Sequence, residues 1–338
     1  MMIPVQMNAI TIAQPGGPDM LRMQAVPVPA CGAGEVLIRV AAAGVNGPDL
    51  AQRRGHYDPP PGASPLLGLE VSGEVAAVGD GVTSCRVGDR VMALCNGGGY
   101  AEFVSVPAGQ VLAAPKGWSM AEAAALPETW FTITQTLVMR AGLEPGMSVL
   151  VHGAAGGIGG AAIQIATILG AQAIGVISSP EKAAYARRLG AIATIDASED
   201  IAARAMELTG GRGVDRVVDI IGGEMAARNI AASARGGHIV QISTLDGAAA
   251  NVSLRTIMAK QLTLSGSTLR PQSGATKATI AERIRTTLLP ALEAADFVRP
   301  AITSLPLSAA AEAHRVMEGR GHIGKIVLFT AGGQAQQA

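Results

Sequence analysis

A glycine-rich loop between an apolar strand pattern and an apolar-periodic helix is the strongest chemical signal in the chain. The segment SVLVHGAAGGIGGAAIQIA, residues 148–166, contains Gly153, Gly156 and Gly159 in a GxxGxxG spacing, with Gly157 as a fourth glycine. Backbone N–H groups at a helix N-terminus bind phosphate when no side chain obstructs the approach. In a chain with 43 glycines the spacing alone fits an ordinary loop. The strand before it and the helix after it favour a dinucleotide-binding site.

Residues that would choose between NAD and NADP follow the second strand of this pattern. Ser178 lies 19 residues after Gly159, where NAD-preferring sites usually place Asp or Glu on the ribose 2′-hydroxyl. This chain has Ser-Ser-Pro there, with Lys182 on the next predicted helix. A hydroxyl and an ammonium suit a 2′-phosphate better than a diol, so the pattern favours NADPH. The alternative is that Ser178 and Pro180 merely start a helix and Lys182 is solvated.

Other catalytic patterns are missing from the sequence. The five histidines are scattered, and His152 and His238 fall in strand patterns, where we expect structural roles. No Cys, His and carboxylate cluster has zinc spacing, and there is neither a GxSxG nor a Walker-type motif. A dinucleotide site without a metal or an evident acid–base pair leaves the difficult chemistry to the cofactor. This indicates hydride transfer onto an electrophilic acceptor.

Two regions with different secondary-structure patterns must position these residues. Residues 1 to about 125 contain short strand patterns, such as 35–43, 70–78 and 90–94, separated by glycine turns. This pattern predicts a small all-β unit of the barrel type. After Pro127, apolar strands alternate with helices up to a last strand at 262–266, which predicts a parallel sheet covered on both faces. A long helix and a short strand follow. The tail AGGQAQQA is expected to be frayed.

Composition excludes several classes of protein. A length of 338 residues suggests two domains, and the low charged share of 15% excludes a disordered scaffold. With 26 basic and 26 acidic residues, we expect no nucleic-acid or membrane partner. Three cysteines without a CxxC, no basic flank at the N-terminus and no apolar run of 18 residues predict a cytoplasmic, soluble protein.

Segments spread over nearly the whole chain resemble the zinc-independent quinone oxidoreductases of the medium-chain dehydrogenase/reductase superfamily, in particular the p53-inducible quinone oxidoreductase type. They include AAAGVNGPDLAQRRGHYDPPPGASPLLGLEVSGEV, AALPETWFT, HGAAGGIGGAAIQIA, GGRGVDRVVDIIGG and EAHRVMEGRGHIGKIVL. The resemblance implies an α/β fold. A GroES-like β-barrel catalytic domain, residues 1–128 and 271–338, would carry an inserted Rossmann domain with a doubly wound parallel sheet, residues 129–270.

The resemblance also implies that no metal is bound. Zinc-dependent members of the superfamily carry a cysteine where this chain has Asn46, and Gly-His-Glu where it has Gly68-Leu69-Glu70. Only Cys95 stands near the position of their cysteine-rich zinc lobe. The thiolate and imidazole ligands are therefore both replaced.

Roles for individual residues follow from the same resemblance. Asn46 and Tyr57 would face the nicotinamide and the substrate as the catalytic pair. The cofactor NADPH would contact Thr132 beside the nicotinamide, Gly156, Gly157 and Ile158 at the pyrophosphate, Ser178 and Lys182 at the 2′-phosphate, and Gly222, Leu245, Thr268 and Leu269 on the nicotinamide side. This chain departs from the family at two places. Relatives often have Ser at the position of Gly156, and they have Asn-Tyr at the position of Asp196-Ala197.

Purely structural roles remain open for Tyr57 and Asn46, and also for the neighbouring residue Asp49. Tyr57 is either a phenol that donates to the acceptor oxygen or an aromatic lid wedged by the prolines at 59–61. Asn46 could be a turn residue before Gly47, and Asp49 could simply cap the next helical turn.

Three functions fit the sequence. The first is an NADPH:quinone reductase acting on a small-molecule quinone, by hydride transfer or by single electrons overall. The second is an alkenal or enoyl reductase, which needs a tuned acid to protonate a carbon; Tyr57, with an ordinary pKa of about 10, is the one candidate. The third is a non-enzymatic NADPH-binding protein. The family resemblance suggests a homodimer, formed by pairing sheet edges through residues 262–266.

Overall fold

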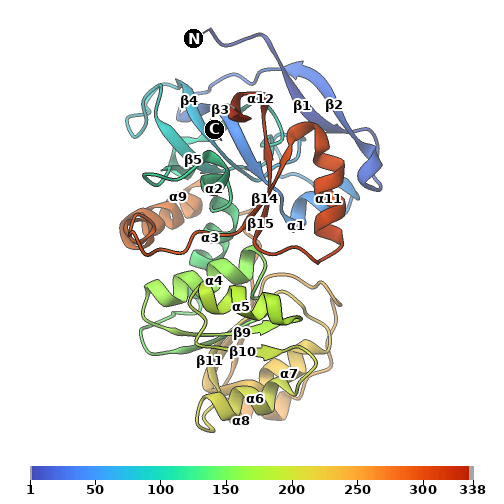
Figure 1. Cartoon of the computed structure of the whole chain (residues 1–338), viewed down its shortest axis with the longest axis vertical. Helices are drawn as coiled ribbons and strands as arrows, with labels where there is room; N and C mark the ends of the chain where they lie inside the picture. Colours follow the sequence, from blue (N-terminus) through green and yellow to red (C-terminus); the bar gives the residue numbers. More distant parts are fainter. Residues whose placement is uncertain (1, 335–338) are drawn as a thin grey trace. The chain divides into compact units, whose positions relative to one another are not determined.

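The computed structural model describes residues 2–334. The chain divides into two compact units, which are described separately: the first combines Met1–Phe131 with Arg270–Ala338, and the second is Thr132–Leu269. Their colours follow the sequence in Figure 1, so the first unit is blue to green and orange to red, and the second is green to yellow.

The first unit is built on a seven-stranded sheet. Its strands run in the order β14-β15-β3-β4-β5-β7, with β6 pairing β3, and β1 and β2 form a separate antiparallel pair. All pairs in the larger sheet are antiparallel except β14 with β15. The elements are β1 (Gln6–Ile12), η1 (Pro18–Met20), β2 (Leu21–Pro27), β3 (Glu35–Gly44), α1 (Gly47–Arg53), β4 (Glu70–Val78), β5 (Arg90–Leu94), β6 (Phe103–Pro107), η2 (Ala108–Gln110), β7 (Val111–Ala113), α2 (Met120–Ala124), α3 (Pro127–Ile133, ending in the second unit), α9 (Gly274–Arg283), η4 (Ile284–Leu288), α10 (Leu289–Leu292), β14 (Ile302–Pro306), η5 (Leu307–Ala309), α11 (Ala310–Glu318), β15 (Lys325–Phe329) and α12 (Ala331–Gln334).

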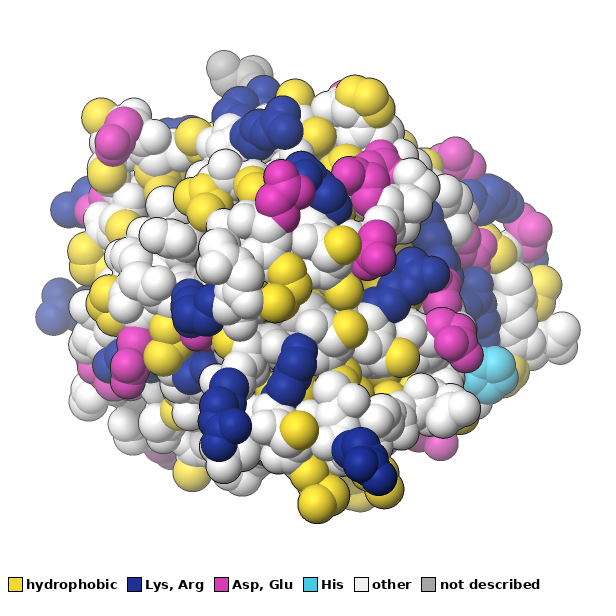
Figure 2. Space-filling view, turned by 90° about the horizontal axis from the view of Figure 1, so that it is seen from below, with side chains coloured by type: hydrophobic (Ala, Val, Ile, Leu, Met, Phe, Trp, Pro, Cys, Tyr) yellow, Lys and Arg dark blue, Asp and Glu magenta, His cyan; other side chains and the backbone are white. Residues whose placement is uncertain are grey.

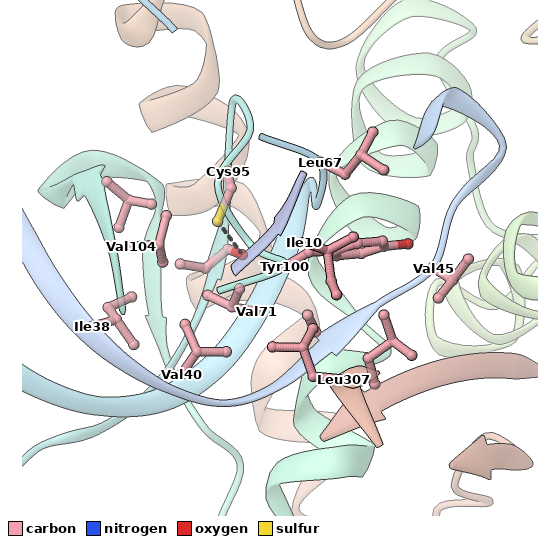
Figure 3. Close-up of a cluster of buried hydrophobic side chains, with 14 of the residues drawn as sticks. Ile10, Ile38, Val40, Val45, Leu67, Val71, Cys95, Tyr100, Val104 and Leu307 are labelled. Carbon is pink, nitrogen blue, oxygen red and sulfur yellow. Dashed lines mark hydrogen bonds between the residues drawn. The ribbon is translucent and has the colours of Figure 1, made fainter. Parts of the chain in front are cut away.

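The main hydrophobic cluster of this unit consists of aliphatic side chains and two cysteines, with Tyr100 as the residue in it that carries a hydroxyl. Figure 3 shows Ile38, Val40 and Val71 of the sheet in one buried cluster with Tyr100. The Tyr100 hydroxyl lies 3.2 Å from Nε2 of His314, so its one polar atom is satisfied although the residue is fully buried. Burial holds the pKa of His314 down to about 3, and the imidazole is neutral at pH 7.

The expectation of a frayed C-terminal tail is wrong for its first residues. Residues 331–334 form the short helix α12, and a Cβ at Gly333 would lie 2.1 Å from the carbonyl oxygen of Ala41 on β3. Small residues therefore let the chain pack closely against the sheet, which a composition argument does not anticipate. Residues 335–338 lie outside the described part of the chain.

The second unit is a six-stranded sheet in which every pairing is parallel. The order β10-β9-β8-β11-β12-β13 is 3-2-1-4-5-6 when counted from the first strand, as in doubly wound dinucleotide-binding sheets. The expected α/β fold with a parallel sheet is confirmed. The elements are η3 (Thr134–Arg140, a π-helix that continues α3), β8 (Ser148–Val151), α4 (Gly157–Ile168), β9 (Gln172–Ile177), α5 (Pro180–Arg188), β10 (Ala193–Asp196), α6 (Ile201–Leu208), β11 (Val214–Asp219), α7 (Met225–Ala232), β12 (Ser233–Gln241), α8 (Leu254–Lys260) and β13 (Thr263–Gly266).

Strands of the second unit are apolar because helices cover them. Leu150, Ile174 and Val217, from three neighbouring strands, are fully buried. Runs of this kind identify parallel strands in the sequence. Helices α6 and α8 were not predicted from the sequence. Helix α8 contains no buried residue, so it lacks the apolar stripe that would identify it.

The face drawn in Figure 2 carries charges of both signs. On the face drawn in Figure 2, Lys and Arg side chains are interspersed with acidic and apolar ones. Among the described residues, no helix combines the length and the hydropathy required to cross a membrane.

Candidate functional site

The glycine loop of the second unit leaves a helix N-terminus open. After β8, Gly153 adopts a positive φ of 61°, which turns the chain toward α4. A Cβ at Gly159 would lie 2.2 Å from the carbonyl oxygen of Gly153, so this glycine permits close packing of helix on loop. Gly156 is the N-cap of α4 and has no side chain to cover the first N–H groups of Gly157 and Ile158. These groups can donate hydrogen bonds to an anion such as a pyrophosphate.

Ser178 and Lys182 are brought together at the end of β9. Lys182 Nζ donates to Ser178 Oγ at 3.2 Å. The side chain of Ser179, not that of Ser178, caps α5 by accepting from the Lys182 backbone N–H. The helix start therefore does not use the Ser178 hydroxyl, which remains exposed beside an ammonium group.

A carboxylate lies on the neighbouring strand. Asp196 of β10 pairs in register with Ile177, the residue before Ser178. Hydrogen bonds from the Ser198 hydroxyl and backbone N–H lower the pKa of Asp196, which therefore keeps its negative charge at neutral pH.

The residues expected on the nicotinamide side all belong to the second unit. Thr132 is buried in α3, and its carbonyl accepts from the Thr136 hydroxyl at 2.6 Å. Gly222 has a positive φ of 71°, and Leu269 is buried whereas Leu245 is half exposed. Thr268 directly precedes Leu269 at the end of this unit.

A buried polar chain that the sequence analysis missed fixes the turn at Gly222. Asp219, at the end of β11, accepts from the backbone N–H groups of Ile221 and Gly222 with Oδ1. Its Oδ2 accepts from Asn229, whose amide oxygen lies 2.7 Å from Nε2 of His152. Burial lowers the pKa of His152.

Asn46, in the first unit, is hydrogen-bonded to both members of the buried ion pair between Lys325 and Glu70. Lys325 Nζ lies 2.5 Å from Glu70 Oε1 and 2.7 Å from Asn46 Oδ1. Asn46 Nδ2 in turn donates to Glu70 Oε1 at 2.8 Å. Both ends of the amide are thus engaged by β4 and β15, an arrangement that orients Asn46 rather than leaving it free to turn.

Asp49 has the capping role considered for it. Its Oδ2 accepts from the Asn46 backbone N–H at 2.9 Å, and its Oδ1 accepts from Gly68 at 2.9 Å. Asn46 is itself the N-cap of α1. Complete burial raises the pKa of Asp49 to about 6 despite these hydrogen bonds.

Tyr57 lies over a guanidinium that the sequence analysis did not assign. The Arg270 guanidinium carbon is 5.5 Å from the centroid of the Tyr57 ring, within range of a cation–π contact. Arg270 is fixed by Gln52 Oε1 at 2.8 Å and by the carbonyl of Asn96. Within residues 2–334 the Tyr57 hydroxyl has no hydrogen-bond partner. Desolvation raises its pKa, as does the charge of Glu128, against the effect of Arg270.

Glu128 is the second ionisable residue that sequence reasoning missed. It lies in the first turn of α3, and its backbone N–H donates to Glu70 Oε2 at 2.9 Å. Desolvation by the surrounding protein, and to a smaller extent the negative charge of Glu70, raise the pKa of Glu128 to about 8. The residue nevertheless keeps part of its surface exposed. The one signal in the sequence is an acidic residue inside the otherwise apolar segment AALPETWFT.

Metal-binding side chains do not gather in this region. Among the described residues, no group of three or more His, Cys, Asp and Glu side chains has the arrangement of a metal site. Leu69 is buried. The Cys95 thiol lies in the hydrophobic cluster, donates to the Ala93 carbonyl at 3.9 Å and has a pKa raised by burial.

Comparison with known proteins gives both units relatives. Residues 32–116 match the alcohol dehydrogenase GroES-like domain, and residues 157–284 match the zinc-binding dehydrogenase family. The mouse quinone oxidoreductase is 32% identical over 330 residues, 96% of this chain and 98% of the mouse protein. A mycobacterial protein solved with NADPH is 32% identical, with a TM-score of 0.83 over 96% of this chain and 99% of its own. The CurK enoyl reductase is 28% identical, with a TM-score of 0.83 over 97% of this chain and 100% of its own.

Proposed function

Because the chain belongs to the quinone oxidoreductases of the medium-chain dehydrogenase/reductase superfamily, we propose that it reduces quinones with NADPH and without zinc. The observation that carries the cofactor choice is the Ser178–Lys182 pair, 3.2 Å apart, at the end of β9. An NAD site would place a carboxylate there to accept from the ribose hydroxyls. The related mycobacterial structure that holds NADPH supports the same choice.

Residues of the second unit fit the cofactor. Gly156, Gly157 and Ile158 would hold the pyrophosphate with backbone N–H groups, where a side chain at Gly159 would not fit. Bound NADPH supplies a hydride. Thr132, Gly222, Leu245, Thr268 and Leu269 would line its nicotinamide side, as the family resemblance implies.

Residues of the first unit would handle the acceptor. The Tyr57 hydroxyl, without a protein partner among the described residues, would donate a hydrogen bond to the acceptor oxygen as charge develops on it. Arg270, under the ring, would stabilise the same charge. Asn46 would contribute through its fixed amide, oriented by Lys325 and Glu70.

Zinc independence is supported by the side chains at the positions where relatives bind the metal. An amide at Asn46 already carries two hydrogen bonds, and Leu69 offers no ligand atom. Elemental analysis after dialysis, together with turnover in the presence of a chelator, tests this. One zinc per chain that is required for turnover would contradict it.

A cofactor and acceptor panel tests the whole proposal. NADPH and NADH oxidation is measured with 9,10-phenanthrenequinone and 1,4-benzoquinone. We expect quinone-dependent oxidation with NADPH preferred. No quinone turnover with either cofactor would contradict the proposal, and equal affinity for both would contradict the cofactor assignment.

The homodimer and the cytoplasmic location remain proposals. Strand β13 is at the edge of its sheet, and Leu264 on it is 44% exposed, which supports pairing with a second copy. Three free cysteines support a reducing compartment. A light-scattering mass of one chain would contradict the dimer.

A further inference from the structure

Three buried polar residues form one hydrogen-bonded chain inside the second unit. Nε2 of His152, which follows β8, lies 2.7 Å from Oδ1 of Asn229 on α7. Asn229 Nδ2 donates to Oδ2 of Asp219, the last residue of β11, at 2.9 Å. None of the three is more than 1% exposed. Buried polar groups require partners, whereas aliphatic side chains would fill the same space without that requirement. The groups at the two ends of the chain therefore show what it does.

The carboxyl end of this chain holds the turn that follows β11. Oδ1 of Asp219 accepts from the backbone N–H of Ile221 at 2.6 Å and from that of Gly222 at 3.1 Å. Gly222 and Gly223 have positive φ angles of 71° and 53°. Because glycine adopts many backbone conformations with similar ease, the two hydrogen bonds to Asp219 select one path for this turn.

The turn in its place holds the loop that follows β12. The Leu245 N–H donates to the Ile220 carbonyl at 3.2 Å, and the Gly223 N–H donates to the Gly247 carbonyl at 3.0 Å. A Cβ at Gly222 would lie 2.6 Å from the Gly247 carbonyl oxygen, so the turn and the loop are in direct backbone contact. A displacement of the turn would therefore displace the loop that carries Leu245.

The histidine end of the chain adjoins the glycine loop. His152 directly precedes Gly153, and a Cβ at Gly153 would lie 2.7 Å from Cδ1 of Ile220 in the turn. The strands β8, β11 and β12 are neighbours in the sheet, so the segments after them share its carboxyl edge. Sheets of this order bind a dinucleotide across that edge. With the pyrophosphate at α4 and the 2′-phosphate beyond β9, the nicotinamide half would extend over the ends of β11 and β12.

We propose that His152, Asn229 and Asp219 are positioning residues for the nicotinamide half of the cofactor. This inference rests on the proposed function, in which the glycine loop and Ser178 bind the other half of NADPH. The chain would fix the segments 220–223 and 244–247 before the cofactor arrives, so that binding does not have to order two glycine-containing segments. Ser178 follows β9, on the opposite side of β8 from β11. Binding of the adenosine half should therefore not depend on the chain.

The direction of each hydrogen bond makes a reciprocal exchange possible. Asp219 accepts at both oxygens, so Asn229 must present Nδ2 to Asp219 and Oδ1 to His152. Asp219→Asn places two amide donors against each other, and Asn229→Asp places two carboxyl groups against each other. The double exchange Asp219→Asn/Asn229→Asp restores a donor opposite an acceptor at every link of the chain.

The test compares binding of NADPH with binding of adenosine 2′,5′-bisphosphate, which lacks the nicotinamide half. In each single variant, Kd for NADPH should rise about tenfold, as expected for one unsatisfied buried group, while Kd for the bisphosphate changes by less than about twofold. The double exchange should return Kd for NADPH to within about threefold of wild type.

A matched control lies at the other end of the same strand. Asp215 of β11 accepts from the Ser148 N–H at 2.8 Å and from its hydroxyl at 2.9 Å. Asp215→Asn makes the same chemical change away from the carboxyl edge of the sheet. It should lower stability and leave the ratio of the two Kd values unchanged.

Hydrogen exchange in cofactor-free protein tests the positioning step directly. In Asp219→Asn, backbone N–H groups of segments 220–223 and 244–247 should exchange about tenfold faster than in wild type, because the hydrogen bonds that order these segments are lost. Exchange in β9 and α5 should stay the same. In Asp215→Asn the two segments should exchange as in wild type.

The outcomes separate this inference from the proposed function. Wild type that binds no NADPH, or that does not use it to reduce quinones, overturns the proposed function. If wild type does both, single variants that weaken both ligands equally, or weaken neither, overturn only the inference. A double exchange that stays as weak as the single variants overturns it too. If neither single variant folds, His152→Leu is compared with His152→Gln, which keeps a donor toward Asn229. Equal Kd values for NADPH in these two variants would overturn the inference.

Discussion

The two units differ in the kind of group that each presents for binding. In the second unit, the glycine loop presents backbone N–H groups at the start of α4, and one contiguous segment of the chain supplies them. In the first unit, the corresponding groups are charged side chains. They are three carboxyls (Asp49 on α1, Glu70 on β4 and Glu128 on α3) and three cations (Lys277 on α9, Lys325 on β15 and Arg270, which precedes α9). An anion can reach the backbone N–H groups because no side chain covers them. The properties of the charged cluster depend on the partner of each charged group. Substitutions should therefore act by steric obstruction in one unit and by unpaired charge in the other.

The largest effect should come from breaking the buried ion pair of the first unit. Lys325→Met leaves Glu70 uncompensated, and removal of one partner of such a pair costs about 3–5 kcal/mol. Urea denaturation should show this loss in the free energy of unfolding. The double variant Lys325→Met/Glu70→Gln should be more stable than the single one, because no charge is left unpaired. Equal stability of both variants would show that the ion pair does not carry the effect.

Adding one methyl group should have the next largest effect, in the second unit. Gly159→Ala places a Cβ 2.2 Å from the Gly153 carbonyl and 2.6 Å from Ala154 Cα, both backbone atoms that cannot rotate away. Overpacking of this kind costs about 1–3 kcal/mol. Thermal unfolding and NADPH titration should both deteriorate. Unchanged cofactor affinity would separate this glycine from the binding site.

Lys182→Ala should weaken NADPH binding about tenfold and leave NADH nearly unaffected. A hydrogen bond to a charged group is worth about 1.5–3 kcal/mol, and solvent screening at this accessible position favours the lower end. The total preference should be smaller than in relatives, because Ala197 stands where they have a tyrosine. Kd measured at low and high salt should show the effect of Lys182 shrinking with salt. Arg187→Ala, at the other end of α5, is the control. Equal weakening of both cofactors would contradict the 2′-phosphate assignment.

Tyr57→Phe should lower quinone turnover about fivefold, while NADPH affinity stays the same. Loss of one neutral hydrogen bond that forms in the transition state costs about 1 kcal/mol. Steady-state kinetics with several quinones measures it. If kcat is unchanged for all of them, Tyr57 is a lid, held by its contact with Arg270.

The smallest effect belongs to Gly156→Ser, which restores the residue often found in relatives. A Cβ at Gly156 meets the Gly153 carbonyl at 3.4 Å, an ordinary contact, and serine is a favoured N-cap. Stability should rise by a few tenths of a kcal/mol, with NADPH affinity unchanged or improved. Thermal unfolding and titration check both. A clear loss of affinity would show that the bare backbone is required here.

The difference between the units also explains what could be predicted from the sequence. The glycine loop and the Ser178–Lys182 pair are local, because a turn with positive φ and a contact between residues four positions apart both act within short stretches of chain. The parallel sheet joins distant strands, but each of its strands is recognisable as a short apolar run between helices. The Asp49 cap is local in the same sense, since Asp49 stands three residues after Asn46. Sequence alone determined these features because short-range geometry dictates them.

Only the tertiary structure decided the chemistry of the first unit. Lys325 and Glu70 are 255 positions apart, and Arg270 reaches Tyr57 across 213. Whether Glu128 is an ordinary carboxylate or an acid with a pKa near 8 depends on how many protein atoms surround it and on which cations are already bound elsewhere. Desolvation and charge pairing are sums over neighbours in space, and a linear sequence does not contain that sum until the chain has folded.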